Sequence, residues 1–344
     1  MTNIKDIAKR VGVSTATVSH VLNGTGRVGE DTRKKVLHVI DELNYTPNRI
    51  AKSLKVKKTS TLGIIAEDVT VFNTPSIIDG INEVAENNGL GILLVNLRIF
   101  HKMGTDFSDK DKLRKLLAQA FEQLHMNQVD GIIYIGTYNR DVTEAIPPIQ
   151  IPVVYTYCKT TNESDYTVNY DDEEAAYKAT KHLIEHGHKK IALISGKVDS
   201  VHSHERFNGY CRALKENGVT LEPCLIKNGD WEVESGYYLT KELLDEKNRP
   251  TAIVALNDLM AYGSIKAAKE KGLNVPSDLS IIGFDNREFS AYTSPELTTM
   301  SIPLHLMGEK ATYILHELIN GKTLEERELK LYCEMINRNS VCKI

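Results

Sequence analysis

A short polar segment near the N-terminus carries the side chains best placed to hydrogen-bond to another molecule. Val18 and Val21 form an apolar side if residues 15–23 are helical, and the opposite side is then small and polar. Small outer side chains let a helix backbone lie deep in a DNA major groove, where hydroxyl and imidazole groups reach base edges. The outward residues are Thr15, Ala16, Thr17, Ser19 and His20.

The neighbouring elements fit a helix-turn-helix. Residues 4–11 place Ile and Val on one helical face, and Gly12 permits a tight turn. Ser14 can cap the second helix, and a third helix is predicted over about 30–43. A glycine turn between two short helices favours a DNA-binding head. A three-helix bundle without a DNA role is the alternative.

Charge separates this head from the rest of the chain. Residues 1–60 hold twelve Lys and Arg against five Asp and Glu, whereas the remainder holds 30 against 41. A basic head on an acidic body predicts a polyanionic partner for the head alone.

The remaining 284 residues alternate short apolar runs with amphipathic helices. Continuous Val, Ile and Leu runs predict strands buried on both faces, and their alternation with helices predicts a parallel α/β sheet. Two such series predict two similar lobes. The expected strands are 61–67, 91–97, 129–136, 151–157, 190–196, 224–227, 251–256, 280–285 and about 329–336; the expected helices are 75–88, 109–127, 172–187, 203–217, 233–246, 257–271 and 304–319.

Several function classes lack support in the sequence. No apolar run approaches the roughly 18 residues of a membrane span, and the first ten residues are too charged for a signal peptide. Five scattered cysteines without CxxC fit a reduced cytoplasm. GTGRVG at 24–29 follows a helix instead of a strand, so it predicts no phosphate loop. No catalytic residue, metal or cofactor is expected.

Two long segments resemble one family closely. IKDIAKRVGVSTATVSHVLNG at 4–24 and TRKKVLHVIDELNYTPNRIAKSLKVKKTSTLGII at 32–65 are similar to the lactose-repressor (LacI/GalR) family of bacterial transcription regulators. The resemblance implies that Thr15, Ala16 and His20 read bases. Many members have Arg where His20 stands, and a histidine makes a single guanine contact in place of a bidentate one.

The resemblance also implies a hinge helix within 47–60. In the family a leucine of this helix wedges a base step in the minor groove, and Leu54 matches it. On periodicity alone this segment is a linker, since about eight residues are marginal as an isolated helix. The residues that would contact the DNA backbone are Ser14, Thr17, Ser19, Asn23, Tyr45, Asn48, Lys52 and Lys55.

For the body, the resemblance implies a type I periplasmic-binding-protein fold. We therefore expect an all-α head at 1–46, a hinge at 47–60 and an effector-binding and dimerisation domain at 61–344. Lobe 1 is expected at about 61–158 and 290–320, and lobe 2 at about 159–289 and 321–344. A cleft is expected where the strand ends of the two lobes meet.

The same resemblance supplies effector-binding candidates. A guanidinium at 206 suits hydroxyls or carboxylates, and Trp231 offers a flat face for a sugar or a base. For Asn257 a helix cap is the alternative, for Asp285 a turn residue, and for Trp231 a packing role. The full set is Phe72, Asn73, Tyr157, Arg206, Trp231, Asn257 and Asp285.

Two departures from the family limit the ligand assignment. Tyr157 stands where many members have an aspartate, and 67–80 lacks the usual Asn-Pro-Phe-Phe turn. The loop 98–111 is longer than expected and has no assigned role.

These features predict a cytoplasmic, homodimeric repressor that binds a pseudo-palindromic operator under the control of a small-molecule effector. A carbohydrate is the leading effector, with a purine or a phosphoprotein coregulator as alternatives. A sugar-transport protein would need an export signal and no head. A head fused to a metabolic enzyme would need catalytic residues.

Overall fold

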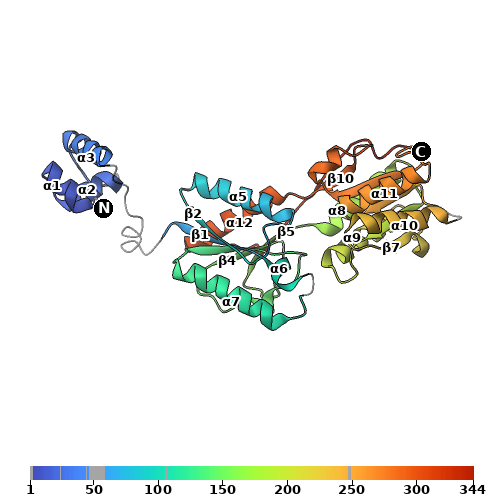
Figure 1. Cartoon of the computed structure of the whole chain (residues 1–344), viewed down its shortest axis with the longest axis horizontal. Helices are drawn as coiled ribbons and strands as arrows, with labels where there is room; N and C mark the ends of the chain where they lie inside the picture. Colours follow the sequence, from blue (N-terminus) through green and yellow to red (C-terminus); the bar gives the residue numbers. More distant parts are fainter. Residues whose placement is uncertain (1–2, 24, 44, 46–58, 105–106, 247–248) are drawn as a thin grey trace. The chain divides into compact units, whose positions relative to one another are not determined.

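The computed structural model describes residues 3–23, 25–43, 45, 59–104, 107–246 and 249–344. The chain forms two compact units, Met1–Ser60 and Thr61–Ile344 (Figure 1). The first unit is the head and the second is the body.

The described part of the head contains three helices: α1 (Ile4–Val11), α2 (Thr15–Asn23) and α3 (Glu30–Glu42). The Asn3 side chain caps α1 by accepting hydrogen bonds from the backbone N–H groups of Lys5 and Asp6, at 2.8 and 3.2 Å. Gly12 ends α1 with a left-handed φ of 77°, as its position in the sequence predicts. The core lies between the three helices, where Ile7, Val18 and Val36 are fully buried.

Residues 47–58 of the predicted hinge lie outside the described residues. This applies to Asn48, Lys52, Leu54 and Lys55, and the side chain of Asn23 is likewise not described. Their DNA contacts therefore stay predictions.

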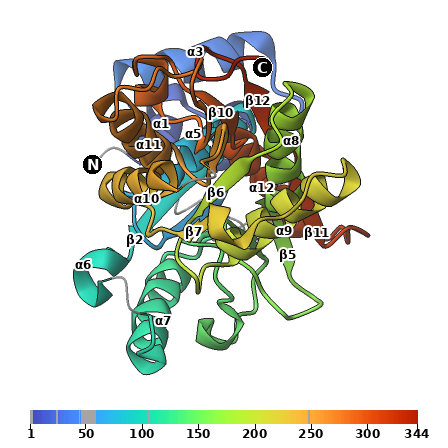
Figure 2. The ribbon, with the colours of Figure 1, turned by 90° about the vertical axis from the view of Figure 1, so that its right-hand side faces the viewer.

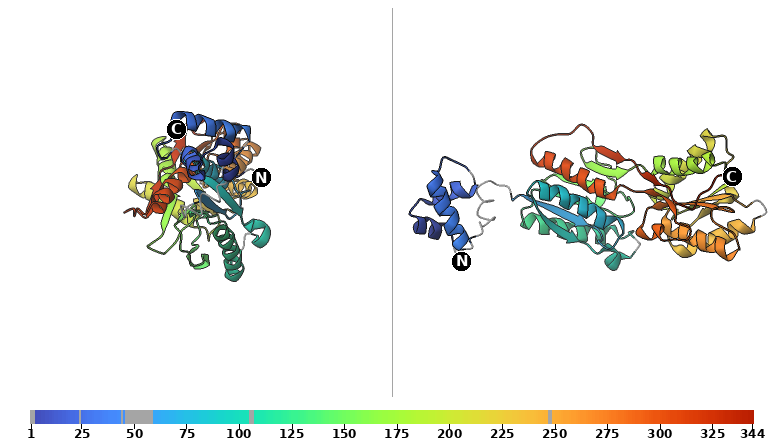
Figure 3. Two further views of the ribbon diagram at one scale, coloured as in Figure 1. Left: turned by 90° about the vertical axis from the view of Figure 1, so that its left-hand side faces the viewer. Right: turned by 90° about the horizontal axis from the view of Figure 1, so that it is seen from above.

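The first sheet of the body is parallel, with strand order β11-β5-β4-β3-β1-β2. Helices α5 and α12 lie side by side over one face, and α7 covers the other (Figures 1 and 3). The strands are β1 (Thr61–Ala66), β2 (Gly91–Asn96), β3 (Gly131–Ile135), β4 (Val153–Thr156), β5 (Tyr166–Tyr170) and β11 (Glu328–Leu331). The helices are α5 (Asn73–Asn87), α6 (Ile99–Met103), α7 (Lys110–Met126) and α12 (Leu304–Ile319).

The second sheet has the order β12-β10-β9-β8-β6-β7, and only β12 is antiparallel to its neighbour. One helix pair, α8 with α9, and another, α10 with α11, flank it (Figure 2). The strands are β6 (Ile191–Ser195), β7 (Ile226–Asn228), β8 (Ala252–Ala255), β9 (Ser280–Asp285), β10 (Thr298–Ser301) and β12 (Glu334–Ile336). The helices are α8 (Asp172–Glu185), α9 (Val201–Glu216), α10 (Val233–Asp245) and α11 (Asp258–Glu270), with short 3₁₀ turns at Pro223–Leu225 and Glu288–Ala291. A further 3₁₀ turn, Thr143–Ala145, lies between β3 and β4 of the first sheet.

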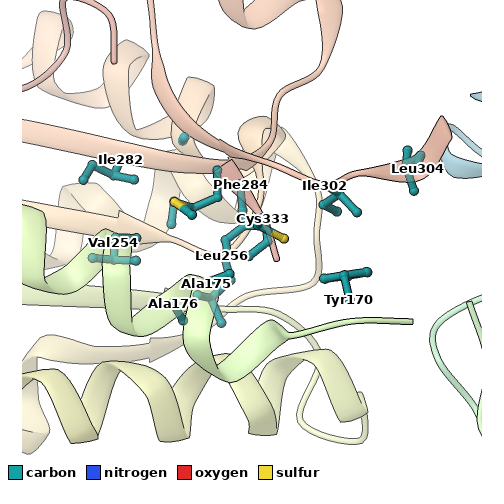
Figure 4. Packing of buried hydrophobic residues seen from close by; sticks show 14 of the residues in the cluster. Tyr170, Ala175, Ala176, Val254, Leu256, Ile282, Phe284, Ile302, Leu304 and Cys333 are labelled. Atoms are coloured by element: carbon teal, nitrogen blue, oxygen red, sulfur yellow. The ribbon is translucent and has the colours of Figure 1, made fainter. Parts of the chain in front are cut away.

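The chain passes between the sheets three times: after β5, after β10 and after β11. Figure 4 shows Tyr170, Ile302 and Cys333 at these three crossings. All three are buried in a single hydrophobic cluster that contains residues of both sheets. The crossings therefore form a shared apolar core between the lobes.

Sheet membership corrects the expected lobe boundaries. Residues 166–170 belong to the first sheet although 159–289 were assigned to lobe 2, and 298–301 belong to the second sheet although 290–320 were assigned to lobe 1. The expected strand at 329–336 is two strands, β11 in the first sheet and β12 in the second. Each crossing takes only a few residues, so no linker composition marks it.

Across the described part of the chain, no helix combines the length and the apolar character that a membrane span needs.

Candidate functional sites

The outward face of α2 is arranged as the sequence predicts. Ser14 caps the helix, because its Oγ accepts a hydrogen bond from the backbone N–H of Thr17 at 3.0 Å. Thr15, Ala16 and His20 are exposed, which leaves them available to a partner. Thr17 and Ser19 are half-buried beside them.

The turn after α2 holds the His20 ring. Its Nδ1 lies 3.3 Å from the Thr25 hydroxyl oxygen. Gly26 has a φ of 77°, and a Cβ there would lie only 2.9 Å from His20 Nδ1. Thr25 and Gly26 thus position the imidazole, and neither was singled out from the sequence.

Tyr45 follows α3 and packs against the head core. Its backbone N–H donates to the Ile40 carbonyl oxygen at 2.9 Å. An Arg10–Glu42 ion pair joins α1 to α3 in the same region. Tyr45 therefore has a packing role in the head, and its proposed contact with the DNA backbone is untested.

A second candidate site is a cavity of about 170 Å³ between the two sheets of the body. Six of the seven predicted effector residues line it, and Asn73 does not. The lining residues are Val71, Phe72, Tyr138, Tyr157, His202, Arg206, Trp231, Glu232, Asn257, Leu259, Asp285 and Arg287.

Asn73 is instead fully buried as the first residue of α5. Among the described residues, neither of its side-chain amide atoms has a hydrogen-bond partner. Phe72, which precedes it, reaches the cavity together with Val71 of the same turn.

The topology explains why distant residues meet at the cavity. Tyr157 follows β4, Asn257 follows β8 and Asp285 ends β9. The carboxyl ends of parallel strands lie on one edge of a sheet, which is where ligands bind in open α/β folds. The two lobes each contribute such an edge.

Backbone strain concentrates at the cavity. Tyr138, Tyr157, Trp231 and Asp285 have φ values of 59°, 57°, 79° and 105°, in the left-handed region that favours glycine. Such residues persist only where the surrounding structure holds them, and they cluster at ligand sites. Here the strain accompanies side chains that line the cavity.

Arg206 is anchored by protein groups. Its Nε donates to Asp172 Oδ1 at 2.6 Å and its Nη2 to the Tyr170 hydroxyl at 2.8 Å. Its Nη1 donates to the Leu256 carbonyl oxygen and lies 3.9 Å from Asp285 Oδ1. These three bonds use three of the five guanidinium donors. Arg206 therefore positions neighbouring groups as well as facing the cavity.

His202 lies one helical turn before Arg206 and was not predicted. Its Nδ1 lies 2.7 Å from Asp172 Oδ2 and 3.1 Å from the Tyr170 hydroxyl. Burial alone would raise the pKa of Asp172, but His202 and Arg206 hold that pKa below its usual value. Asp172 is therefore an anionic acceptor between two donors.

Asn257 acts as the helix cap that we considered as an alternative. Its Oδ1 accepts from the Met260 N–H and its Nδ2 donates to the Trp231 carbonyl oxygen, both at 2.8 Å. The cap starts α11, and the second bond fixes the strained Trp231 backbone. A ligand contact of Asn257 remains a prediction.

Trp231 lies against the end of β6. A Cβ at Gly196 would come within 2.0 Å of the indole ring, so glycine is required for this contact. The Trp231 Nε1 is buried without a hydrogen-bond partner in the described structure. The indole therefore offers an aromatic face and an N–H donor.

Two buried carboxyl groups have perturbed pKa values. Burial raises the pKa of Asp285 well above its usual range, against the opposing effect of Arg206. Burial also raises the pKa of Asp258 to about 7. Asp258 Oδ1 accepts from the Thr299 hydroxyl at 2.6 Å and its Oδ2 from the Arg287 N–H at 2.7 Å, which holds the cavity loop after β9.

The unassigned loop 98–111 reaches the cavity through Tyr138. Phe100 and Phe107 pack on the Tyr138 ring, with centroids 5.8 and 6.3 Å away. Arg140 lies over Phe107 at 4.0 Å and donates to the fully buried Glu67 at 2.6 Å. This loop thus supports the lobe 1 wall of the cavity.

A larger hollow of about 610 Å³ lies beside β4, lined by Pro147, Pro148 and Pro152 among others. It has no buried charged network like that around Arg206. The smaller cavity is therefore the candidate effector site.

The arrangement defines a class of protein: a helix-turn-helix head joined to a two-lobed small-molecule-binding body. Residues 3–48 match the family described as bacterial regulatory proteins, lacI family. Residues 180–341 match the periplasmic binding protein-like domain.

Whole-length relatives agree. The chain is 35% identical over 347 residues to the HTH-type transcriptional repressor PurR of Vibrio atlanticus (strain LGP32), covering 99% of each. It is 36% identical over 330 residues to catabolite control protein A of Priestia megaterium, covering 95% of this chain and 96% of that protein.

A structure of the Lac repressor dimer bound to operator and the anti-inducer ONPF matches with a TM-score of 0.80 and 27% identity over 99% of both chains. A complex of the transcriptional regulator CelR with cellobiose matches with a TM-score of 0.66 and 28% identity, over 99% of this chain and 100% of that one.

The chain belongs to the lacI family of bacterial regulatory proteins. It is a transcriptional repressor whose binding to DNA is controlled by an effector. The predicted fold and function are confirmed at this level.

Proposed function

We propose that the effector is a small carbohydrate bound in the 170 Å³ cavity. The observation that carries this is the convergence of an indole face and N–H at Trp231 with the polar groups of Arg206 and Asp285. An apolar ring face stacked on an aromatic, with polar edges held by fixed donors and acceptors, suits a sugar. The cavity is smaller than the roughly 300–1,000 Å³ of drug-sized ligand sites, which favours a monosaccharide.

A purine is the second candidate. Several relatives bear the name PurR, and the flat Trp231 ring suits a nucleobase equally well. Two points weigh against a purine. The DNA sequence that the head recognises and the effector that the body binds can diverge from each other, and the CelR relative was solved with cellobiose.

Intrinsic fluorescence distinguishes the two, since Trp231 is the only tryptophan. We expect a saturable change with one sugar among D-glucose, D-galactose, D-ribose and their phosphates. Calorimetry on Trp231→Phe provides the control, because weaker sugar binding in that variant links the signal to stacking. A response to hypoxanthine or guanine alone would replace the carbohydrate with a purine.

We propose further that the body binds its effector without catalysing a reaction, and that the protein acts in the cytoplasm. The similarity of the chain to transcriptional repressors supports the absence of catalysis. Unchanged sugar after prolonged incubation, measured by chromatography, is the expected result.

For the DNA contacts, we propose that Thr15, Ala16 and His20 read bases and that Leu54 wedges a base step. Their support is the exposed α2 face and, for Leu54, the family resemblance. Leu54→Ala should weaken binding to the specific operator far more than binding to random DNA, because only the specific complex forms the bend. Gel shifts at one salt concentration measure both, and equal losses would refute the wedge.

A further inference from the structure

Two nitrogen atoms of the cavity walls remain without a hydrogen-bond partner in the described part of the chain. They are His202 Nε2 and Trp231 Nε1, on side chains that both line the cavity. Buried polar atoms in native proteins are normally paired, so such atoms in a ligand cavity mark positions for ligand groups. The indole N–H can only donate, so it requires an acceptor on the ligand.

The role of His202 Nε2 follows from its other ring nitrogen. Asp172 Oδ2, at 2.7 Å from His202 Nδ1, belongs to a carboxylate that accepts hydrogen bonds only. His202 Nδ1 must therefore carry a hydrogen. The Tyr170 hydroxyl oxygen at 3.1 Å also accepts a bond from Arg206, which fits the same assignment. In the neutral ring, Nε2 is then a bare acceptor.

The His202 ring is held in one orientation. Its plane stacks on Tyr170 at 5.6 Å and 12°, and the Tyr157 ring lies 5.3 Å away. The His202 side chain is 6% exposed. The acceptor is thus fixed before a ligand binds, which lowers the ordering cost of binding.

We propose that His202 determines effector specificity by accepting, through Nε2, a hydrogen bond from a hydroxyl or N–H group of the ligand. Trp231 Nε1 makes the complementary contact by donating to a ligand oxygen or nitrogen. The effector therefore carries one donor and one acceptor at these two positions. This rests on the proposed effector site and extends it to a residue that the sequence did not identify.

The first test needs no ligand. Long-range ¹H–¹⁵N spectra of the full chain, labelled with ¹⁵N-histidine, report which ring nitrogen is protonated. The set of signals that disappears from the spectrum of His202→Gln belongs to His202. We expect a hydrogen on Nδ1 and none on Nε2. A hydrogen on Nε2 would overturn the proposal.

The second test measures affinity by calorimetry. The probe is whichever of D-glucose, D-galactose, D-ribose, hypoxanthine or guanine gives the largest Trp231 response. His202→Phe should raise Kd roughly tenfold, equivalent to about 1.4 kcal/mol, because the acceptor is lost. His202→Gln keeps an acceptor near the Nε2 position and should recover part of the affinity. If His202→Phe does not fold, His202→Gln still tests the proposal.

His204→Phe is the matched control, since His204 lies on the same helix but is exposed. Its Kd should equal that of the native protein. Native affinity in both His202 variants would refute the role of His202 and leave the effector site in place. No response of the native protein to any probe would instead overturn the effector assignment, and the inference with it.

Discussion

Asp258 shows how a residue without a direct ligand contact can control the cavity. It holds the Arg287 backbone and the Thr299 hydroxyl, and its burial raises its pKa to about 7. Asp285, the last residue of β9, and Arg287, in the loop that follows, are both cavity residues. Near neutral pH, ionisation of the buried Asp258 side chain therefore lowers the free energy of unfolding.

This predicts a specific pH dependence. Between about pH 4 and 7 the folded protein keeps a proton on Asp258 that the unfolded chain has lost, so the unfolding free energy decreases as the pH rises. The slope contributed by this single group is at most about 1.4 kcal/mol per pH unit. Asp258→Asn resembles the protonated acid and should lose this contribution. Urea unfolding at pH 5, 6 and 7 measures it.

The unfolding free energy of the native protein relative to Asp258→Asn should thus decrease from pH 5 to pH 7. Asp199→Asn, which changes an exposed carboxylate of the same lobe, should show a constant difference from the native protein. A constant difference for Asp258→Asn as well would contradict the raised pKa.

The predicted effector residues that line the cavity follow recognisable strands or lie in family motifs. Prediction from the sequence missed His202 although that residue is four positions before Arg206, which places both on one helical face. It missed Asp172 because the strand before it, YTVNY, contains Thr167 and Asn169 and lacks a continuous apolar run. Both polar residues are buried inside the sheet.

At the scale of elements, periodicity located most helices and strands to within a few residues. The expected helix at 304–319 coincides with α12, and the expected strand at 280–285 with β9. Which sheet a strand joins was harder to predict. β11 pairs with β5, and β12 pairs with β10, in both cases through contacts between residues far apart in the sequence. Only two residues separate β11 from β12, although the two strands join different sheets.

The α5–α12 pair illustrates packing that depends on small residues. A Cβ at Gly308 would lie 2.1 Å from the Ile77 carbonyl oxygen, and a Cβ at Gly80 would lie 2.0 Å from the His305 carbonyl oxygen. The two glycines let the helix backbones touch. Larger side chains would push the helices apart.

Gly308→Ala should therefore destabilise the body by about 1–3 kcal/mol, despite the higher helix propensity of alanine. Urea unfolding should show a lower midpoint with an unchanged m value. Lys310→Ala, an exposed change on the same helix, is the control and should stay within about 0.5 kcal/mol of the native protein. Stabilisation by Gly308→Ala would contradict the close approach.

At the scale of the whole molecule, the effector cavity joins two lobes that share three chain crossings. Residues of both sheets line it, with Phe72 and Tyr157 on one side and Arg206 and Asp285 on the other. A ligand that contacts both sides changes the balance between lobe arrangements by its differential affinity for them. In a repressor controlled by an effector, this balance sets operator affinity.

Coupling of this kind is reciprocal, because both binding free energies refer to the same two states. The factor by which a saturating effector changes the operator Kd must equal the factor by which saturating operator changes the effector Kd. Fluorescence anisotropy of labelled operator measures the first factor and calorimetry with operator-bound protein the second. Agreement in both size and direction is expected.

A variant separates this coupling from simple loss of binding. Tyr138→Phe keeps the ring that packs on Phe100 and Phe107 and removes a hydroxyl from the lobe 1 wall. Any change in the coupling should appear as the same change in both factors, whichever direction it takes. If saturating effector left the operator affinity of the native protein unchanged, the two sites would not share one conformational equilibrium, and control through lobe arrangement would be refuted.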